Sequence, residues 1–329
     1  MQPLITVQSL RKQFRYRKAG HGLKGLLSGA LAAPTIPIDA VAGVSFEISA
    51  GERVAIIGPN GAGKSTTLKI LTGVLEPNSG NVQVLGLTPW RQRRALAFRT
   101  GVVFGQRSQL WGELPARDSF ALLRHIYEQD AAVFARRQDD LIERFGLARF
   151  IDQPVQRLSL GERMRCEITA SLLHAPEVLF LDEPTIGLDI TAKADIRDFI
   201  REHSQAAGQT VLLTSHDTRD IELVCDRVIV INQGRIVLDQ PTDQLRRRFL
   251  NRKLVTLQSA APRIDLDLPG LVVRSREPHR TVFEVDTGSV RLEQVIAAAL
   301  GQGGIDDITI EDPPMEEVIR EIYASDIAA

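Results

Sequence analysis

The sequence predicts an α/β fold built on a mostly parallel sheet, followed by a small α+β appendage. Short apolar runs alternate with helical stretches from the amino terminus to about residue 240. This alternation is typical of parallel sheets whose strands are buried on both faces. A glycine-rich turn between one apolar run and a helix supports the same fold, and a change of pattern near Arg246 marks the start of the appendage.

The composition limits the classes of protein to which the chain can belong. It has 329 residues, 43% of them hydrophobic, and 40 Lys and Arg against 41 Asp and Glu give a formal net charge of −1. Nucleic-acid binding rests on clustered positive charge, so the sequence predicts no nucleic-acid partner. The chain lacks a signal-peptide pattern and any apolar run of about 18 residues. We therefore expect it to stay in the cytoplasm and not to span a bilayer.

The expected elements follow in chain order. Strands are predicted at 4–10, 41–49, 53–58, 82–86, 101–105, 178–184, 210–215 and 227–231, and helices at 64–73 and 163–175. An inserted segment at 17–38 separates the first two strands and carries the short run LKGLLSGAL. Two interpretations of it stay open, a surface loop and a short amphipathic helix that contacts a partner or a membrane face.

The chain beyond Arg246 predicts a separate accessory domain. A basic connector, RRRFLNRK, leads into strands at 253–259, 271–276, 281–286 and 307–312 and helices at 290–300 and 314–325. About 80 residues is within the usual range of domain sizes. We therefore expect one domain at 1–245 and an α+β domain at 246–329.

The strongest chemical signal is the segment 58–65, which fits G-x-x-x-x-G-K-[ST] between a buried strand and a helix. Its glycines let backbone N–H groups point at phosphate groups, and the helix N-terminus adds partial positive charge. Lys64 is expected to reach the β and γ phosphates, Ser65 to bind Mg²⁺ and Thr66 to donate to the α phosphate. The expected phosphate-binding residues are Gly58, Pro59, Asn60, Gly61, Ala62, Gly63, Lys64, Ser65 and Thr66.

The apolar run at 178–181 ends in Asp182 and Glu183. A buried parallel strand delivers its last residues to the edge of the sheet where phosphates bind. Asp182 is therefore expected to hold Mg²⁺ through water, and Glu183 to orient or deprotonate the attacking water. Together with the phosphate loop, this strand predicts a nucleotide site of a kind that kinases, helicases, GTPases and transport ATPases share.

Further motifs give the chain a resemblance to the ATP-binding subunit of ABC transporters. LSLGE at 158–162 matches that family's L-S-G-G-Q signature at three of five positions. Asp189 in GLD resembles its D-loop, and His216 in LLTSHD resembles its switch histidine. Gln106, directly after the strand at 101–105, resembles its Q-loop glutamine. The motif order agrees from the first strand to about residue 240.

Some assignments within this resemblance have competitors. Gln109 competes with Gln106 for the Q-loop role, and Gln106 is favoured because it directly follows its strand. Phe14 is the expected residue that stacks on adenine, with Tyr16 as its rival. Glu162 replaces the glutamine of the signature and brings a carboxylate near the partner's ATP. Like-charge repulsion then weakens closure unless Arg163 or Arg165 compensates.

The resemblance implies a P-loop ATPase core with an antiparallel β subdomain and a helical subdomain at about 107–172. It implies ATP and Mg²⁺ as ligands, with Gln106 joining Ser65 and Asp182 at the metal. Hydrolysis would be carried by Glu183 and His216 with Gln106 and Asp189. In a homodimer, Ser159, Gly161 and Glu162 of one chain would face the ATP of the other.

The same resemblance implies a partner and a cellular role. An integral-membrane permease would dock near RSQLWGELP, which contains Trp111 and Leu114, and would hold the chain on the inner face of the membrane. The tail DITIEDPPMEEVIREIY is similar to those of exporter-type ATPases for drugs or other small amphipathic compounds. The alternatives are an ATPase of a cell-surface polysaccharide or glycolipid exporter and a non-transport ATP-binding module.

Overall fold

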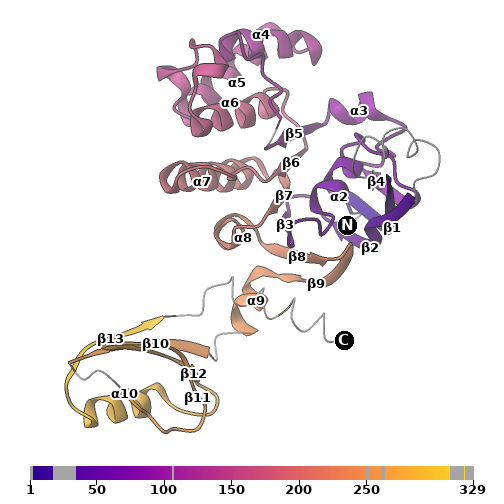
Figure 1. The fold of residues 1–329 in the computed structure, drawn as a ribbon. Helices are drawn as coiled ribbons and strands as arrows, with labels where there is room; N and C mark the ends of the chain where they lie inside the picture. The colour runs from indigo at the N-terminus through magenta and orange to yellow at the C-terminus, as the bar shows by residue number, and fades with distance from the viewer. Residues whose placement is uncertain are drawn as a thin grey trace, which may run out of the picture. The chain divides into compact units, whose positions relative to one another are not determined.

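The computed structural model describes residues 3–17, 35–105, 107–248, 252–260, 264–311 and 322. The chain forms two compact units, Met1–Gln240 and Pro241–Ala329 (Figure 1). The boundary at 240/241 lies slightly before the expected boundary at 245/246.

A six-stranded sheet forms the centre of the first unit, with the strand order β5-β6-β7-β3-β8-β9. The strands are β3 (Arg53–Ile57), β5 (Thr100–Phe104), β6 (Val178–Asp182), β7 (Thr210–Ser215), β8 (Arg227–Asn232) and β9 (Arg235–Pro241). The pairs β5–β6, β6–β7, β7–β3 and β3–β8 are parallel. The carboxyl ends of β3, β6 and β7 therefore meet at one edge of the sheet.

A second sheet is antiparallel and has the order β2-β1-β4. Its strands are β1 (Ile5–Arg17), β2 (Thr35–Ile48) and β4 (Ser79–Val84). The strands β1 and β2 are longer than the sequence predicts and pair as far as Arg17 opposite Thr35. Residues 13–17 alternate polar and aromatic side chains, a pattern that suits a strand, so pairing extends into the segment expected to be an insertion.

The helices of the first unit fall into two groups (Figure 1). The range expected for the helical subdomain contains α4 (Ala116–Ile126), α5 (Ala131–Arg144) and α6 (Leu160–Leu172). It also contains the 3₁₀ turns Leu147–Arg149 and Val155–Arg157. The remaining helices are α2 (Lys64–Leu71), α3 (Arg93–Ala97), α7 (Ile190–Ala207) and α8 (Thr218–Val224). Helix α6 begins earlier than the expected residue 163 because Ser159 caps it.

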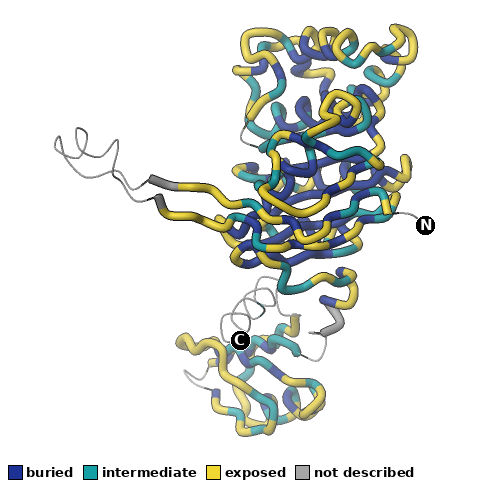
Figure 2. The backbone as a smooth tube through the Cα atoms, turned by 90° about the vertical axis from the view of Figure 1, so that its right-hand side faces the viewer, coloured by how far each residue is buried: buried dark blue, intermediate teal, exposed yellow. Residues whose placement is uncertain are grey.

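One hydrophobic core joins the two sheets through α2. Phe180 on β6 and Ile56 on β3 are fully buried against Leu68 on α2 and Val82 on β4. The strands β3, β6, β7 and β8 consist almost entirely of buried residues, and Figure 2 shows buried segments concentrated in the interior of the first unit. The core thus fixes the loop between β3 and α2, which carries the glycine-rich motif.

The second unit is a four-stranded antiparallel sheet with one described helix against it. The sheet order is β11-β12-β10-β13. The elements are α9 (Thr242–Arg248), β10 (Arg252–Ser259), β11 (Leu271–Glu277), β12 (Arg280–Asp286), α10 (Leu292–Gly301) and β13 (Ile305–Glu311). Val295 and Ala299 of α10 join Phe283 in the core. The expected helix at 314–325 lies outside the described residues except for residue 322.

A glycine substitution tests the packing of β5 against the chain around α6. A Cβ atom on Gly101 would lie 2.3 Å from the carbonyl oxygen of Ser171, whereas a Cβ on Gly112 would find only Gln156 at 3.9 Å. We predict that Gly101→Ala lowers the free energy of unfolding by about 1 to 3 kcal/mol through overpacking, and that Gly112→Ala has little effect. Denaturant titration measures both. Equal stability of the two variants would contradict this packing.

Candidate functional site

The glycine-rich loop connects β3 to α2 and depends on the absence of two side chains. A Cβ atom on Gly58 would lie 2.3 Å from the carbonyl oxygen of Ile231, and one on Gly63 would lie 2.2 Å from that of Ala40. Gly63 also has a φ of 106°, in the region that favours glycine, and it caps the start of α2. The close approach of β2 and β8 therefore requires glycine at both ends of the loop.

Lys64 is buried within this loop, with 5% of its surface exposed. Its Nζ atom donates to the carbonyl oxygens of Gly58 at 2.7 Å and Pro59 at 3.3 Å, and lies 3.7 Å from Oε1 of Glu183. Burial lowers the pKa of the ammonium group, and the carboxylates of Glu183 and Asp182 partly offset that effect. The loop thus holds a positive charge beside two acids at the strand end.

Asp182, the last residue of β6, accepts two hydrogen bonds on Oδ1. The donors are Oγ of Ser65 at 2.8 Å and Oγ1 of Thr214 on β7 at 2.6 Å. A hydroxyl and a carboxylate are the hard oxygen ligands that Mg²⁺ prefers, with substrate phosphates completing its shell. The described residues contain no group of three or more His, Cys, Asp and Glu that could hold a metal alone. The residues present therefore fit a magnesium ion shared with a nucleotide.

Glu183 lies between Lys64 and His216. Its backbone N–H donates to Oγ1 of Thr214 at 3.1 Å and to the carbonyl oxygen of Thr214 at 3.0 Å, and its φ is +53°. This unusual backbone conformation brings Oε2 to 3.6 Å from Nδ1 of His216. The His216 side chain is 53% exposed. A base and an imidazole therefore meet at the carboxyl ends of β6 and β7.

A cavity of about 580 Å³ opens at this edge of the sheet. Its lining comes from the phosphate loop, α2, the end of β5 and the end of β6. The lining residues are Asn60, Ser65, Lys69, Val74, Phe104, Gly105, Arg107, Asp182, Glu183 and Ile186. The volume is typical of sites for small ligands. Gln106, which the sequence predicts here, lies outside the described residues.

Phe14 does not belong to that lining. It lies on β1 opposite Ile38, is 43% exposed, and has the Nζ atom of Lys12 5.5 Å from its ring centre. The side chain of its rival, Tyr16, lies outside the described residues. Phe14 therefore remains a prediction as the residue that stacks on adenine.

The signature residues lie at the start of α6, away from the lining described above. Ser159 caps α6 and donates from Oγ to the Glu162 carboxylate at 2.8 Å, while its N–H donates to the same carboxylate at 2.9 Å. Arg165 instead pairs with Asp195. The carboxylate of Glu162 is thus satisfied by the helix cap, and Arg165 does not give it the compensation considered from the sequence.

Gly161 and Asp189 join the start of α6 to the start of α7. A Cβ atom on Gly161 would lie 2.9 Å from the Cβ of Ala192 on α7. Asp189 caps α7 by accepting a hydrogen bond from the N–H of Ala192 at 2.9 Å. The signature segment and the D-loop segment therefore pack together.

Sequence reasoning missed two residues that organise this region, Thr214 and Glu167. Glu167 on α6 is 4% exposed and accepts from Oγ of Ser108 and from the N–H of Gln109 at 3.2 Å. Gln109 also donates from Nε2 to the carbonyl oxygen of Glu167 at 3.0 Å. Gln109 thus fastens the segment after β5 to α6. An acid among the apolar residues of a predicted helix was the available signal for Glu167.

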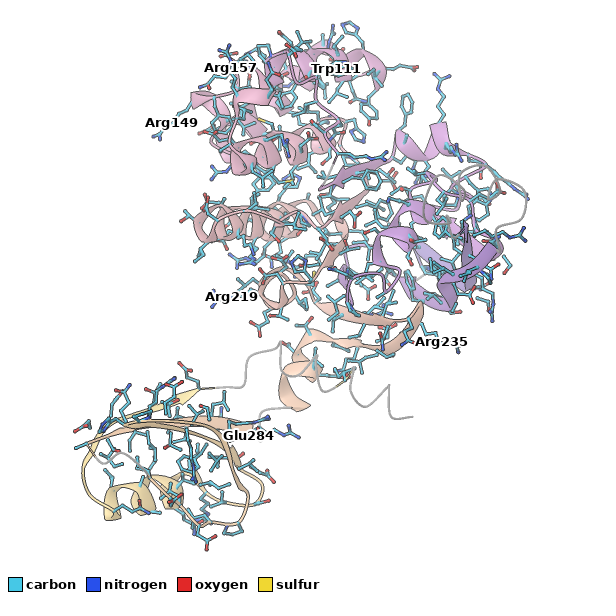
Figure 3. The ribbon with its side chains drawn as sticks, in the orientation of Figure 1. Trp111, Arg149, Arg157, Arg219, Arg235 and Glu284 are labelled. Atoms are coloured by element: carbon cyan, nitrogen blue, oxygen red, sulfur yellow. The ribbon has the colours of Figure 1, made fainter. Side chains whose placement is uncertain are left out.

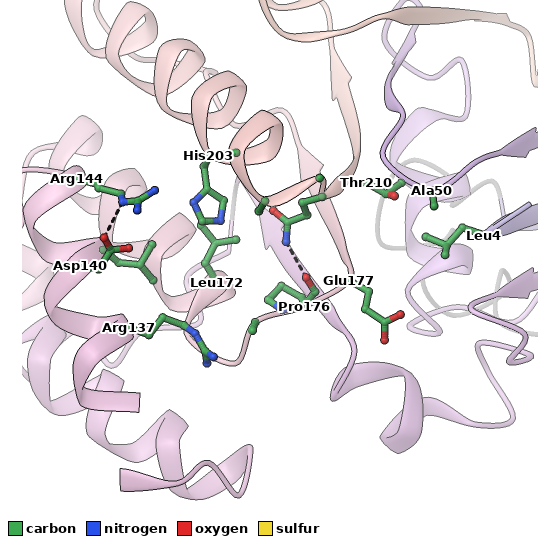
Figure 4. Close-up of a pocket in the computed structure, with 16 residues that line it drawn as sticks. Leu4, Ala50, Arg137, Asp140, Arg144, Leu172, Pro176, Glu177, His203 and Thr210 are labelled. Atoms are coloured by element: carbon green, nitrogen blue, oxygen red, sulfur yellow. Dashed lines mark hydrogen bonds and ion pairs between the residues drawn. The ribbon is translucent and has the colours of Figure 1, made fainter. Parts of the chain in front are cut away.

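A second cavity, of about 630 Å³, lies between α5 and the ends of α6 and α7 (Figure 4). Its lining includes Glu177 and Thr210 at the starts of β6 and β7, at the opposite strand ends from Asp182. Arg144 pairs with Asp140 within it. The lining contains groups of both charges and no residue of the glycine-rich loop, so this cavity is separate from the one at the carboxyl ends of the strands.

A family model and the curated relatives of this chain point to the same family of proteins. The family described as ABC transporter matches residues 41–186. The daunorubicin resistance ATP-binding protein DrrA3 of Streptomyces coeruleorubidus is 31% identical over 87% of this chain and 92% of that protein. The ABC transporter ATP-binding protein NatA of Bacillus subtilis is 34% identical over 61% of this chain and 81% of that protein.

The chain belongs to the ABC transporter ATP-binding proteins. The fold agrees, because a solved ATP-binding subunit of an ABC transporter superposes with a TM-score of 0.61 at 27% identity, covering 75% of this chain and 93% of that one. The protein is accordingly an ATP-binding ATPase, the motor subunit of a transporter. Among its described residues, no helix has the length and apolar character needed to cross a membrane.

The buried acid Glu167 gives a pH-dependent prediction. Burial raises its pKa above the ordinary 4.5, so the folded chain keeps this proton after the unfolded chain has lost it. The free energy of unfolding therefore falls as pH rises from about 4.5 through the raised pKa. We predict that the free energy of unfolding of Glu167→Gln falls less with rising pH than that of the parent chain. Denaturant titrations at several pH values from about 4.5 upward measure this difference. The exposed Glu143→Gln is the control, and an unchanged pH dependence in Glu167→Gln would contradict the prediction.

Proposed function

We propose that ATP binds in the cavity at the carboxyl ends of β3, β6 and β7 and is hydrolysed there. The observation that carries the proposal is the meeting of Lys64, Asp182 and Glu183 beside a glycine loop, with His216 3.6 Å from Glu183. The loop N–H groups and Lys64 bind the β and γ phosphates, and Thr66 donates to the α phosphate. Ser65 and Asp182 hold Mg²⁺, joined by Gln106.

The chemistry is the transfer of the γ phosphoryl group to water. Magnesium, when bound, neutralises charge that develops on the phosphate oxygens. The oxygen of water attacks the γ phosphorus, the bond to the ADP oxygen breaks, and Glu183 orients the water and accepts its proton. His216 contacts the carboxylate of Glu183 and the γ phosphate, and Asp189 supports the site across the dimer. Within one chain, Lys64 and the loop N–H groups stabilise the charge on the phosphate, because they are in place before ATP arrives.

A homodimer completes the site. Ser159, Gly161 and Glu162 start α6 and do not line the cavity of their own chain. We infer that two chains pack head to tail, so that the capped start of α6 in each chain faces the ATP of the other. A symmetric interface of this kind buries two ATP molecules. ATP binding then closes the dimer and hydrolysis opens it.

The partner that this motion drives is an integral-membrane permease. The helical subdomain exposes apolar side chains on the segment between β5 and α4, where Trp111 is 42% and Leu114 37% exposed. Helix α4 itself exposes Leu122 at 42% and Ile126 at 54%. Figure 3 shows Trp111 on this subdomain. Exposed apolar side chains that gather in one region mark interaction sites. Docking here places the protein on the inner face of the membrane.

Export of a small amphipathic compound is the transport function that the relatives support. A daunorubicin resistance protein matches 87% of this chain, including residues beyond the ATPase unit. Its name states resistance to a small compound, which is consistent with removal of that compound from the cell.

Lys64 gives the direct test of nucleotide binding. We predict that Lys64→Ala loses measurable ATP binding and turnover, because it removes the charge-assisted contact to the phosphates. Calorimetric titration with ATP and Mg²⁺ and a phosphate-release assay provide the readouts. Lys253→Ala, which changes a half-buried lysine on β10 of the second unit, far along the chain from the loop, serves as the control. Normal turnover of Lys64→Ala would remove the assignment of this site.

Glu183 gives the test of hydrolysis and of the dimer. We predict that Glu183→Gln binds ATP, lacks turnover and sediments as a dimer with ATP and Mg²⁺, whereas Lys64→Ala stays monomeric. The amide cannot accept the proton of water but leaves phosphate binding intact. A Glu183→Gln variant that stays monomeric at saturating ATP would contradict the dimer.

The permease is tested by affinity purification of tagged Glu183→Gln from detergent-solubilised membranes with ATP present. We predict recovery of a polytopic membrane protein, and weaker recovery when Trp111→Ala and Leu114→Ala are added. Leu223→Ala, which changes an exposed apolar residue on α8, is the control. Recovery of soluble proteins or ribosomes alone would contradict the proposed permease partner and its docking surface, while leaving the ATPase site in place.

A further inference from the structure

A buried carboxylate lies beside the pair formed by Glu183 and His216. Asp220 on α8 is 1% exposed and accepts three hydrogen bonds. The donors are Nε of Arg197 at 2.6 Å, Oγ1 of Thr185 at 2.6 Å and Oγ of Ser215 at 2.5 Å. Arg197 is itself 5% exposed. Burying the charges of Asp220 and Arg197 costs free energy, so each must keep its ion-pair and hydrogen-bond partners in the folded chain.

The three donors belong to three different segments. Thr185 stands two residues after Glu183, in the loop that follows β6. Ser215 ends β7 and directly precedes His216. Arg197 lies in the middle of α7. One carboxylate therefore connects the backbone next to Glu183, the backbone next to His216 and the helix that begins at the D-loop.

Asp217 holds the other side of His216. Its carboxylate accepts from NH2 of Arg197 at 2.8 Å and from Nζ of Lys193 at 2.8 Å. Its backbone N–H donates to Oγ of Ser215 at 2.9 Å. The residues on both sides of His216 are thus tied to the same arginine on α7, directly or through Asp220.

This arrangement bears on the distance between the catalytic groups. Glu183 and His216 follow different strands and approach to 3.6 Å, although the His216 side chain is half exposed. The backbone fixes the positions from which the two side chains reach toward each other, and this backbone is anchored through Thr185 and Ser215. We propose that Asp220, held by Arg197, is a positioning residue that sets the Glu183–His216 distance for ATP hydrolysis. The proposal rests on the catalytic roles proposed above for these two residues.

The test measures steady-state ATP hydrolysis by Asp220→Asn in the full-length chain. The amide keeps the size of the side chain but removes the negative charge that Arg197 pairs with. Its nitrogen cannot accept the hydrogen bonds that Thr185 and Ser215 donate to the carboxylate, so these hydroxyl groups must reorient and the anchors are weakened. We expect kcat to fall at least about tenfold, as small misplacements of catalytic groups do. The KM for ATP and the affinity for ADP should stay within about twofold, because the phosphate loop is untouched. Asp220→Glu, which keeps the carboxylate, should recover part of kcat.

Two further variants separate positioning from folding. Asp198→Asn removes an exposed ion pair with Arg201 on the same helix and should keep the parental kcat. The double variant Arg197→Met/Asp220→Leu removes both buried charges together, a change that is often tolerated by the fold. We expect this variant to keep its melting temperature and still to have a reduced kcat, because the anchors of Thr185 and Ser215 are gone.

The outcomes separate the positioning role of Asp220 from the catalytic roles of Glu183 and His216. If Glu183→Gln is inactive while Asp220→Asn keeps the parental kcat, the positioning role is wrong and the catalytic assignment stands. If the double variant regains the parental kcat, the loss in Asp220→Asn reflects an unpaired buried charge and the positioning role is also wrong. If Glu183→Gln keeps parental turnover, the catalytic assignment fails and this proposal falls with it.

Discussion

The buried ammonium group of Lys64 is the constraint on which the rest of the site depends. A charge removed from water must be met by fixed partners, and here these are two loop carbonyl groups and the carboxylate of Glu183. The loop that supplies those carbonyl groups is packed closely against β2 and β8. This packing is possible because Gly58 and Gly63 have no side chain that would collide with these strands. The parallel sheet then brings the acids of β6 to the same edge. A triphosphate would find its positive partner already in place.

The sequence predicted much of this arrangement because its signals are local. A buried apolar run followed by glycines and Lys64-Ser65 specifies a strand, a turn and a helix, and Asp182-Glu183 ends another buried run. Parallel pairing places such ends together whatever the distance along the chain. The structure accordingly joins Ser65 to Asp182 and brings His216 close to Glu183, as the motif order indicates.

What the sequence could not reveal depends on contacts between distant segments. Thr214 and Asp220 look like ordinary residues of a strand end and a surface helix until β7 lies beside β6 and α8 beside α7. The burial of Glu167 requires the segment around Gln109 to fold onto α6. The full length of β1 and β2 also depends on such contacts, because cross-strand pairing extends both strands to Arg17 and Thr35. The sequence places a carboxylate at Glu162 but does not show that the helix cap gives this carboxylate two donors.

In the proposed dimer, each nucleotide is bound by the phosphate loop of one chain and the start of α6 of another. A crystal structure of Glu183→Gln with ATP and Mg²⁺ tests this arrangement most directly. We expect two chains related head to tail, with each γ phosphate between Lys64 of one chain and Ser159 of its partner, and Mg²⁺ at Ser65 and Asp182. ATP bound away from Lys64, or held by a single chain with Ser159 facing solvent, would contradict it.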